Sequence, residues 1–396
     1  MERPVPFISR VRLKNFKSIA ECDVRLGPLT VLTGPNGSGK SSFLQALALL
    51  GRAVSTTPEE AIAELGGLSA IVRRVPEPAE SFSIDIEAAV PRGPGREERA
   101  PVSYGFGIGA ARGGRAFEVL RETCQLRWAG RGWRFEADHG AVHDESPGSP
   151  VPALEPGRLY LSAAGTRAAF APVLAALAGI RSYSFALDTL RQPSRPAAGA
   201  VLGSRGEHLG DVLSALAAAR PDLKDRIDAY LHAVTPGIKR IDARSAGGYM
   251  TVAFRASNGS EFGPDEISDG TIHAAAVLAA LFQPAASDGR IPLTGIDNPE
   301  TTLHPAATAA LLDALTEASE HAQVIVTTQS PDLLDREDLD ASIARAVSMN
   351  HGLTVIGKVD RASQRIISDG LCTLGELMRG SQLSPEPRAR ATRPQA

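Results

Sequence analysis

Cysteine is scarce in this chain, and metal-binding patterns are missing from it. The three cysteines, Cys22, Cys124 and Cys372, are far apart and odd in number. No two of them have the spacing of a metal site, so we predict reduced thiols in a reducing compartment. Neither an H-E-x-x-H motif nor a cysteine–histidine zinc pattern occurs, which argues against a second, metal-dependent catalytic centre.

Long apolar runs are missing as well. The sequence has no stretch of the roughly 18 apolar residues that a membrane-spanning helix needs. Its first six residues lead directly into an alternating segment, and not into the apolar core of a signal peptide. We therefore predict a cytoplasmic protein without a membrane partner.

No single sign of charge dominates, and repeats are absent. The chain has 42 Lys and Arg residues against 45 Asp and Glu residues, a net charge of −3. A uniformly basic surface is therefore excluded, whereas a local basic groove is not. No internal repeat occurs, nor a heptad run longer than about two heptads, which excludes a long coiled-coil arm. At 396 residues the chain can form several domains, or one large domain with an insertion.

The most informative stretch that is present is a phosphate-binding loop. It consists of Gly34, Pro35, Asn36, Gly37, Ser38, Gly39, Lys40 and Ser41, followed by Ser42. This matches the pattern G-x-x-x-x-G-K followed by Ser or Thr at every fixed position. Residues 28–33 before it are typical of a buried strand, and residues 42–50 after it are typical of a helix. A chance glycine-rich turn would not have both neighbours in place.

The chemistry of this loop predicts ATP and Mg²⁺ as ligands. The glycines allow successive backbone N–H groups to point at phosphate oxygens, and the helix N-terminus adds partial positive charge. Lys40 is expected to reach the β- and γ-phosphates, and the Ser41 hydroxyl is expected to bind Mg²⁺.

Three later segments bear on the same site. Residues 291–300 are typical of a buried strand that ends in Asp297, which we expect to hold the Mg²⁺ shell opposite Ser41. A strand with a plain polar turn is the alternative. Ser268, Asp269 and Gly270 precede the apolar stretch 272–282 and predict either an anion site or an ordinary helix N-cap. Residues 323–328 form a β-branched strand before Gln329, and this could also be a plain core strand.

The order and spacing of these segments resemble the ABC-type ATPase heads of the RecF/SMC group, and most closely the stand-alone ATPases that lack SMC arms. The resemblance covers the opening strand at 11–19, Walker A at 34–41, the signature at 267–271, Walker B at 296–300, the D-loop at 303–305, the switch at 328–331 and the ending at 369–377. It implies an α/β fold, a P-loop NTPase with a mixed sheet and an inserted α+β region.

We expect four parts along the chain. They are the N-terminal part of the head at 1–74, the insertion at 75–255, the C-terminal part of the head at 256–383 and a disordered tail at 384–396. Within the insertion we predict loops at 91–101 and 138–157 and a strand at 159–162. Six arginines are candidates for a DNA-facing surface, with scattered solvent exposure as the equal alternative: Arg73, Arg74, Arg158, Arg167, Arg181 and Arg191. Arg388, Arg390 and Arg393 of the tail are weaker candidates.

The chain departs from the family pattern at two catalytic positions. Asn298 stands where the family has a Glu that orients the attacking water, and Gln329 stands where it has a switch His. An amide cannot take up a proton as a carboxylate does. Glu300 is the candidate replacement for the missing base. We therefore expect weak ATP hydrolysis or a tight ATP-bound clamp.

The resemblance also implies a site shared between two chains. Ser268, Asp269 and Gly270 of one copy would face the γ-phosphate bound to Lys40 of the other, so that ATP joins a homodimer. Relatives act in DNA repair, chromosome handling or phage defence, which makes DNA and a nuclease or toxin protein the expected partners. The alternatives are a nucleotide-sensing module with little hydrolysis and the ATPase subunit of a transporter.

Overall fold

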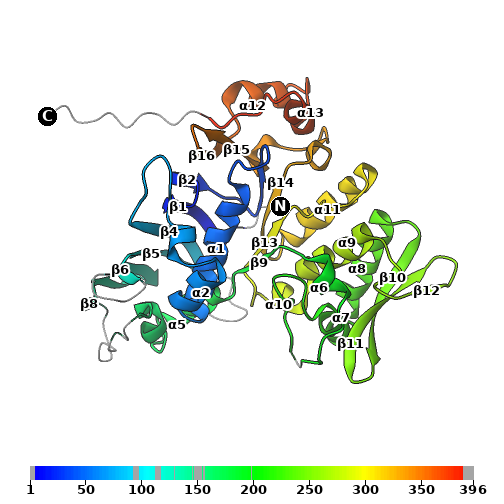
Figure 1. Cartoon of the computed structure of the whole chain (residues 1–396), viewed down its shortest axis with the longest axis horizontal. Helices are drawn as coiled ribbons and strands as arrows, with labels where there is room; N and C mark the ends of the chain where they lie inside the picture. Colours follow the sequence, from blue (N-terminus) through cyan, green and yellow to red (C-terminus); the bar gives the residue numbers. More distant parts are fainter. Residues whose placement is uncertain are drawn as a thin grey trace.

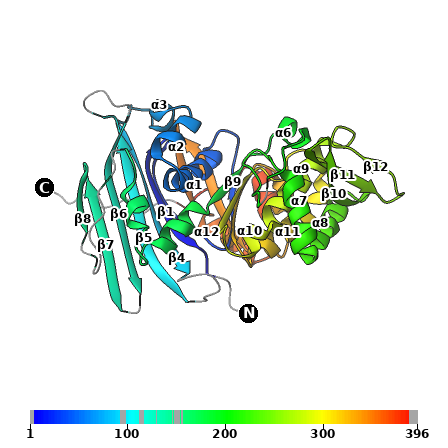
Figure 2. The same cartoon turned by 90° about the horizontal axis from the view of Figure 1, so that it is seen from below.

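The structure is a computed structural model that describes residues 5–91, 98–111, 117–128, 130–144, 146, 154, 157–197 and 199–386. Three sheets form in this part of the chain, and Figures 1 and 2 show them from two directions. A six-stranded sheet in the middle carries the phosphate-binding loop. A seven-stranded antiparallel sheet lies on one side of it, and helices with a three-stranded sheet lie on the other.

The middle sheet has the order β16-β15-β3-β14-β13-β9. Its strands are β3 (Leu29–Thr33), β9 (Arg181–Tyr183), β13 (Leu293–Asp297), β14 (Gln323–Thr328), β15 (Ala344–Asn350) and β16 (Leu353–Lys358). All neighbours pair in parallel except β15 and β16. Every residue of β3 and β14 is buried, as expected for parallel strands covered on both faces.

The antiparallel sheet has the order β2-β1-β4-β5-β6-β7-β8. It consists of β1 (Ile8–Phe16), β2 (Ile19–Arg25), β4 (Ser81–Pro91), β5 (Arg99–Gly109), β6 (Glu118–Trp128), β7 (Arg131–Asp138) and β8 (Ala141–Asp144). Its inner face packs on α1 (Lys40–Ser55), and Phe43 and Leu47 of α1 belong to one buried cluster with Ile84 and Phe106 of the sheet. Strands β1 and β2, which precede the phosphate loop, therefore share one sheet with the strands β4 to β8 that follow residue 75.

The opposite face of the middle sheet is covered by α9 (Asp269–Phe282) and α11 (Thr308–Ala318). All residues from Gly270 to Phe282 are buried, which explains why this segment is apolar all round. Further helices and the small sheet surround it: α6 (Leu187–Arg191), α7 (Leu209–Ala219), α8 (Pro221–Val234), α10 (Pro284–Ser287), β10 (Ile238–Ala246), β11 (Tyr249–Ala256) and β12 (Glu261–Phe262).

The remaining elements lie at the two ends of the molecule. They are α2 (Pro58–Glu64), α3 (Leu68–Ile71), α4 (Tyr160–Ala164), α5 (Ala171–Ala178), α12 (Arg361–Ser368), α13 (Leu374–Arg379) and three short 3-10 helices, η1 (Pro305–Ala307), η2 (Pro331–Leu334) and η3 (Ala341–Ile343). In Figure 1, α12 and α13 lie beside β15 and β16, at the end opposite α7.

The structure corrects three expectations about local structure. Residues 159–162 are not a strand, because α4 begins at Tyr160, where the Glu122 carboxylate accepts hydrogen bonds from the first helical N–H groups. The predicted loop 91–101 already contains the start of β5, since Arg99 pairs with Pro91, and its residues 92–97 lie outside the described part. The predicted loop 138–157 contains β8, which pairs with β7; residues 145, 147–153 and 155–156 lie outside the described part.

The four expected parts stay a prediction, and the strand order shows how they interlock. Residues 75–255 add β4 to β8 to the sheet of β1 and β2, and they place β9 beside β13 in the middle sheet. The start of the predicted tail is ordered, because the Glu386 N–H donates to the Lys358 carbonyl and Pro385 bridges Val359. The tail arginines Arg388, Arg390 and Arg393 lie outside the described residues.

Candidate nucleotide-binding site

Three neighbouring parallel strands end at the same edge of the middle sheet. Thr33 of β3 pairs with Thr328 of β14, and Thr327 pairs with Asp297 of β13. The residues that follow these strands are therefore brought together at this edge: Gly34 of the phosphate loop, Gln329 of the switch and Asn298 of Walker B. Ligands of parallel α/β sheets bind at the carboxyl ends of strands, so the fold places the predicted site residues where a ligand is expected.

The phosphate loop has the backbone that only glycine adopts easily. Gly37 and Gly39 have φ values of 72° and 102°, in the left-handed region that favours glycine. A Cβ atom on Gly39 would also lie 2.1 Å from the Thr354 Oγ1 atom. Helix α1 begins directly at Lys40, so its free N–H groups point into the loop.

Lys40 points back into its own loop. Its Nζ atom donates to the carbonyl oxygens of Gly34 and Pro35, at 2.8 and 2.9 Å, and the residue is 6% exposed. Burial lowers the pKa of Lys40, while the negative charges of Asp297 and Glu300 act in the opposite direction. The ammonium group is therefore held close to both acids and to the loop that would surround a phosphate.

Ser41 and Asp297 meet across the site, although they are far apart in the sequence. The Ser41 hydroxyl donates to the Asp297 Oδ1 atom at 2.9 Å, and the Thr327 hydroxyl donates to the same oxygen. A hydroxyl beside a carboxylate at this edge is the ligand pair that a P-loop ATPase uses for Mg²⁺. The sequence predicted both residues, and the fold places them in direct contact.

Buried polar atoms without a partner mark the site as one that fits a polar ligand. Among the described residues such atoms include Ser38 Oγ, Asn298 Oδ1 and Glu300 Oε2. Because burying a polar atom without a hydrogen bond is costly, atoms of this kind call for an explanation. All three belong to the phosphate loop or to the segment after Asp297, so a phosphate, its cation or its water shell would satisfy them.

Asn298 and Glu300 are held in different ways. Asn298 has a φ of 49°, and its N–H group donates to the Thr327 Oγ1 atom at 3.0 Å. Glu300 is 8% exposed and accepts a hydrogen bond from the Thr328 hydroxyl at 2.6 Å. Burial raises the pKa of Glu300, and the hydrogen bond from Thr328 partly opposes that shift. Gln329 is exposed and lies next to Gly34 through the β3–β14 register.

The signature segment lies on the face of the middle sheet opposite α1 (Figure 2). Ser268 caps α9 by accepting a hydrogen bond from the Thr271 N–H at 3.3 Å, so the N-cap interpretation holds whatever else this residue does. Ser268 and Asp269 are exposed, whereas Gly270 is buried. A Cβ atom on Gly270 would lie 2.5 Å from the carbonyl oxygen of Thr302 and 3.5 Å from the Leu303 Cδ2 atom, so the signature touches the D-loop and the residue before it.

A pocket of about 490 Å³ opens beside Asp297 and Asn298. Phe185, which follows β9, and His273 of α9 line it, and their rings meet edge to face at 5.7 Å. His273 is 5% exposed and its Nδ1 atom has no partner; burial lowers its pKa to about 4. His273 is therefore a neutral group beside the Walker B segment at physiological pH.

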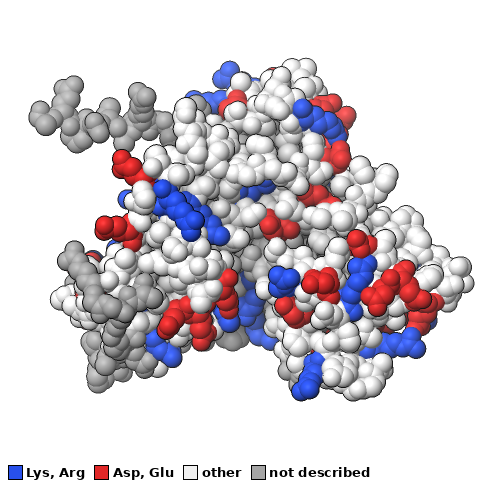
Figure 3. All heavy atoms as spheres, viewed as in Figure 1, with Lys and Arg blue, Asp and Glu red and all other residues white. Residues whose placement is uncertain are grey.

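The six candidate arginines do not form one free basic surface. The side chain of Arg167 is 9% exposed and pairs with Asp144 at 2.5 Å. Arg191 pairs with Asp269 of the signature segment at 2.8 Å and donates to the Ile267 carbonyl at 3.1 Å. Arg73, Arg74 and Arg181 donate to nearby carbonyl or amide oxygens, and Arg158 also has an interaction. Figure 3 shows basic and acidic side chains interspersed on the face drawn.

Sequence reasoning missed the residues that support the site from behind. Thr354 of β16 packs on Gly39, and its hydroxyl is 2.7 Å from the Ser18 hydroxyl. Thr327 holds Asp297, and Arg191 holds the signature segment. Only Thr327 had a signal, since it stands one residue before the end of the strand predicted at 323–328. Thr354 stands in a segment without any motif, and Arg191 was predicted only as a candidate for a DNA-facing surface, not as a partner of the signature segment.

Two further features are absent from the described residues. No helix in this part of the chain is long and apolar enough to cross a membrane. No group of three or more His, Cys, Asp or Glu side chains there could hold a metal ion by itself. A cation at Ser41 and Asp297 would therefore need ligands from outside the protein, such as phosphate oxygens and water.

A protein-family model and curated proteins match this chain. The family model described as "AAA domain, putative AbiEii toxin, Type IV TA system" matches residues 29–335. The DNA replication and repair protein RecF of Magnetococcus marinus is 42% identical over 62 residues, which is 15% of this chain and 16% of RecF. The OLD nuclease of Thermus scotoductus is 44% identical over 43 residues, 11% of this chain and 8% of that nuclease. These matches therefore span only a small part of either relative.

Solved structures show a similar fold over almost the whole chain. An SMC head bound to the C-terminal winged-helix domain of ScpA has a TM-score of 0.56 at 14% identity, and the match covers 91% of this chain and 100% of that one. An SMC head with an extended coiled coil, bound to the C-terminal domain of ScpA from Pyrococcus furiosus, also has a TM-score of 0.56, at 13% identity, and covers 92% and 99%. The predicted ABC-type head fold is thus confirmed.

Proposed function

The chain belongs to the family of AAA-domain ATPases described as putative AbiEii toxins of type IV toxin–antitoxin systems, and we propose that it is a slow ATPase that closes into a dimer around ATP. Membership of this P-loop family implies that the protein binds nucleotide. The observation that carries the proposal is the contact between Ser41 and Asp297 beside Lys40, at the edge where three parallel strands end.

Residues of the phosphate loop would hold the triphosphate. The N–H groups of 37–42 and the Lys40 ammonium supply donors and positive charge, and Ser38 supplies a buried hydroxyl without another partner. Ser41 and Asp297 would hold Mg²⁺, which when bound neutralises charge on the phosphates. Gln329 is exposed beside Gly34 and can donate to a terminal phosphate through its amide.

Slow hydrolysis follows from the chemistry of Asn298 and Glu300. The Asn298 amide can hold a water molecule but cannot accept its proton. Glu300 carries a carboxylate, yet it is buried and already bound to Thr328. A nucleotide-sensing module that scarcely turns ATP over is the second candidate function, and the presence of Asn298 favours it.

A shared site between two copies is supported by the exposure of Ser268 and Asp269. Exposed groups at the start of a long buried helix are available to a partner, whereas Gly270 is buried against the D-loop of its own chain. We further propose DNA or a nuclease as the biological partner, because the relatives include a protein named for DNA replication and repair and a nuclease. The family description adds a toxin role as a variant of the same proposal.

Nucleotide binding by wild type and Lys40→Ala tests the function directly. We expect wild type to bind Mg·ATP and Lys40→Ala to lose at least about 100-fold in affinity, because the buried ammonium is the main charge facing the phosphates. Lys239→Ala, on the exposed face of β10, is the matched control and should bind like wild type.

Turnover with and without double-stranded DNA separates the candidate functions. Stimulation by DNA supports the DNA-linked ATPase, and tight binding without turnover supports the sensing module. A measurable turnover rate that does not change when double-stranded DNA is added would count against DNA as the partner. Equal binding by wild type and Lys40→Ala would refute the nucleotide site itself.

A further inference from the structure

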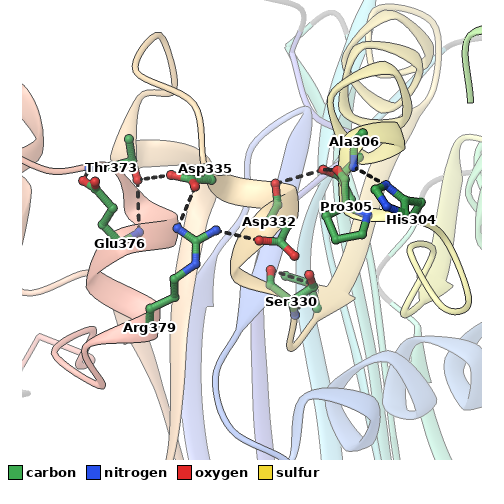
Figure 4. Close-up of polar contacts among 11 residues, drawn as sticks. His304, Pro305, Ala306, Ser330, Asp332, Asp335, Thr373, Glu376 and Arg379 are labelled. Carbon is green, nitrogen blue, oxygen red and sulfur yellow. Dashed lines mark hydrogen bonds and ion pairs between the residues drawn. The ribbon is translucent and has the colours of Figure 1, made fainter.

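The short C-terminal helix α13 bridges two parts of the nucleotide site that are far apart in the sequence. Its first residues, 374–377, belong to the segment 369–377 that resembles the ending of stand-alone ATPases. The proposed nucleotide binding and hydrolysis assign no role to this segment. Figure 4 shows α13 beside η2, the 3-10 helix that begins two residues after Gln329. Helix α13 therefore lies where it can act on the switch.

Arg379 at the end of α13 connects two acids of the switch region. Its guanidinium donates to Asp332 Oδ1 and to Asp335 Oδ2, both at 2.6 Å. Thr373, the N-cap of α13, donates to Asp335 Oδ1, also at 2.6 Å. Both ends of α13 are thus fixed to the segment that follows Gln329. These hydrogen bonds hold the pKa of Asp335 below its usual range, so the carboxylate stays charged.

The backbone of α13 approaches the switch as closely as a glycine allows. A Cβ atom on Gly375 would lie 2.5 Å from the Pro331 carbonyl oxygen and 2.8 Å from the Asp335 Cα atom. No other residue fits there without moving α13 or η2. Leu374 and Leu377 of α13 are buried, at 0% and 2% exposed, and Leu374 belongs to the buried cluster that includes Leu333 and Leu334 of η2.

Met378 extends the contact to the phosphate loop. The Thr33 hydroxyl donates to the Met378 sulfur at 2.8 Å. Thr33 is fully buried and immediately precedes Gly34. Through Met378 and Arg379, α13 therefore contacts the strand before the phosphate loop and the segment after the switch at the same time.

Helix η2 is also connected to the D-loop. The Thr308 hydroxyl donates to the carbonyl oxygen of Asp332 at 3.0 Å and to that of Pro305 at 2.6 Å. Pro305 is the last residue of the D-loop and the first residue of η1. A movement of η2 would therefore shift residues of the phosphate loop, the switch and the D-loop. These are the elements that a terminal phosphate would contact or approach.

We propose that α13 is a positioning element that sets the placement of Gln329, so that the site distinguishes ATP from ADP, with Arg379 and Met378 as its positioning residues. This inference rests on the proposed nucleotide function. Neither residue is placed at the reacting atoms; each acts through η2 or Thr33. Loss of the Arg379 bridge removes its two hydrogen bonds to Asp332 and Asp335 and so loosens the placement of η2 and of Gln329, whereas the N–H groups and Lys40 that would bind the inner phosphates stay in place.

The variants Arg379→Gln and Met378→Leu test this inference. Arg379 is 45% exposed, and exposed ion pairs contribute little to stability, so Arg379→Gln is expected to fold. Arg361→Gln is the matched control, since Arg361 is also an exposed arginine of the C-terminal region in an ion pair, with Glu386 at 2.8 Å. Dissociation constants for Mg·ATP and Mg·ADP, the single-turnover rate and the melting temperature are measured for each protein.

We expect Arg379→Gln to bind Mg·ADP like wild type, while its preference for ATP over ADP and its single-turnover rate each fall roughly fivefold or more, a typical size for coupling between sites. Met378→Leu should show a smaller change in the same direction, and Arg379→Lys should recover part of the preference. Arg361→Gln should match wild type throughout.

Two results would overturn the inference while leaving the nucleotide function standing. One is an Arg379→Gln variant whose preference for ATP over ADP and whose single-turnover rate are the same as in wild type. The other is an Arg379→Gln variant that loses affinity for ATP and ADP equally and has a lower melting temperature. Failure of wild type to bind either nucleotide would instead refute the proposed function, and this inference with it.

Discussion

At the scale of single residues, the proposed hydrolysis depends on which side chain near Asp297 can accept a proton from the attacking water. Asn298 occupies the position next to the Walker B acid, and Glu300 follows two residues later, buried against Thr328. A carboxylate in a buried position has a raised pKa, which brings it closer to the range in which it can act as a base. The hydrogen bond from Thr328 opposes that shift and occupies one carboxylate oxygen, so we expect Glu300 to be a weak base, and its role stays a prediction.

Exchanging these two side chains tests the assignment. We expect Glu300→Gln to lower the single-turnover rate of ATP hydrolysis about tenfold or more, and Asn298→Glu to raise it by a similar factor. General-base catalysis typically contributes about a hundredfold or more, of which a weak base would supply a part. Glu320→Gln, at an exposed position after α11, is the control for a lost carboxylate. An unchanged rate in Glu300→Gln would remove this residue from the mechanism, and no gain in Asn298→Glu would show that the amide is not what limits turnover.

At the scale of elements, one buried carboxylate joins a strand to a helix far from the nucleotide site. Glu122 of β6 is 1% exposed and accepts hydrogen bonds from the Tyr104 hydroxyl at 2.9 Å and from the Leu161 N–H at 3.0 Å. Its other oxygen accepts from the Tyr160 N–H. Burial raises the pKa of Glu122 from 4.5 to about 7, although these hydrogen bonds oppose the shift.

This shift makes the stability of the protein depend on pH in a predictable direction. The folded state favours the protonated carboxyl, so its contribution is fully present below pH 4.5 and is lost as pH rises through about 7. The free energy of unfolding should therefore fall between pH 5 and pH 8, by on the order of 3 kcal/mol from this group if the whole shift is expressed.

Urea unfolding at pH 5, 6, 7 and 8 measures the effect. Glu122→Gln should remove this part of the pH dependence and be less stable than wild type at pH 5, because an amide cannot accept hydrogen bonds at both of its ends. Glu136→Gln, on the neighbouring strand with its side chain 49% exposed, should keep the wild-type slope. The same slope in Glu122→Gln as in wild type would contradict the assignment.

At the scale of the whole molecule, the two halves of the predicted site lie on different surfaces. Lys40 and Ser41 begin a helix on one face of the middle sheet, and Ser268 begins a helix on the other (Figure 2). In the proposed dimer, a second copy would bring its signature segment to a bound γ-phosphate. In this proposal, ATP favours the closed dimer because it contacts both copies only in that state.

Ser268→Arg tests this arrangement by light scattering after size-exclusion chromatography, with and without a non-hydrolysable ATP analogue. We expect the variant to bind the analogue within about twofold of wild type but to remain monomeric where wild type dimerises, because a long cation replaces a small hydroxyl at the contact. Ser257→Arg, at an exposed turn after β11, should dimerise. Normal dimerisation of Ser268→Arg would exclude the shared site.

The sequence by itself determined the phosphate loop, the strand and helix beside it, and the acid that faces Ser41. These follow from local rules, since glycine placement, apolar runs and a strand-ending acid each leave a signal within about ten residues. The tertiary structure alone decided that residues 75–255 share sheets with both ends of the chain. It also decided that Glu122 caps α4, that Arg191 holds the signature segment and that α13 contacts the switch. These contacts join residues from different parts of the chain, and no local pattern records which distant partner a side chain will meet after folding.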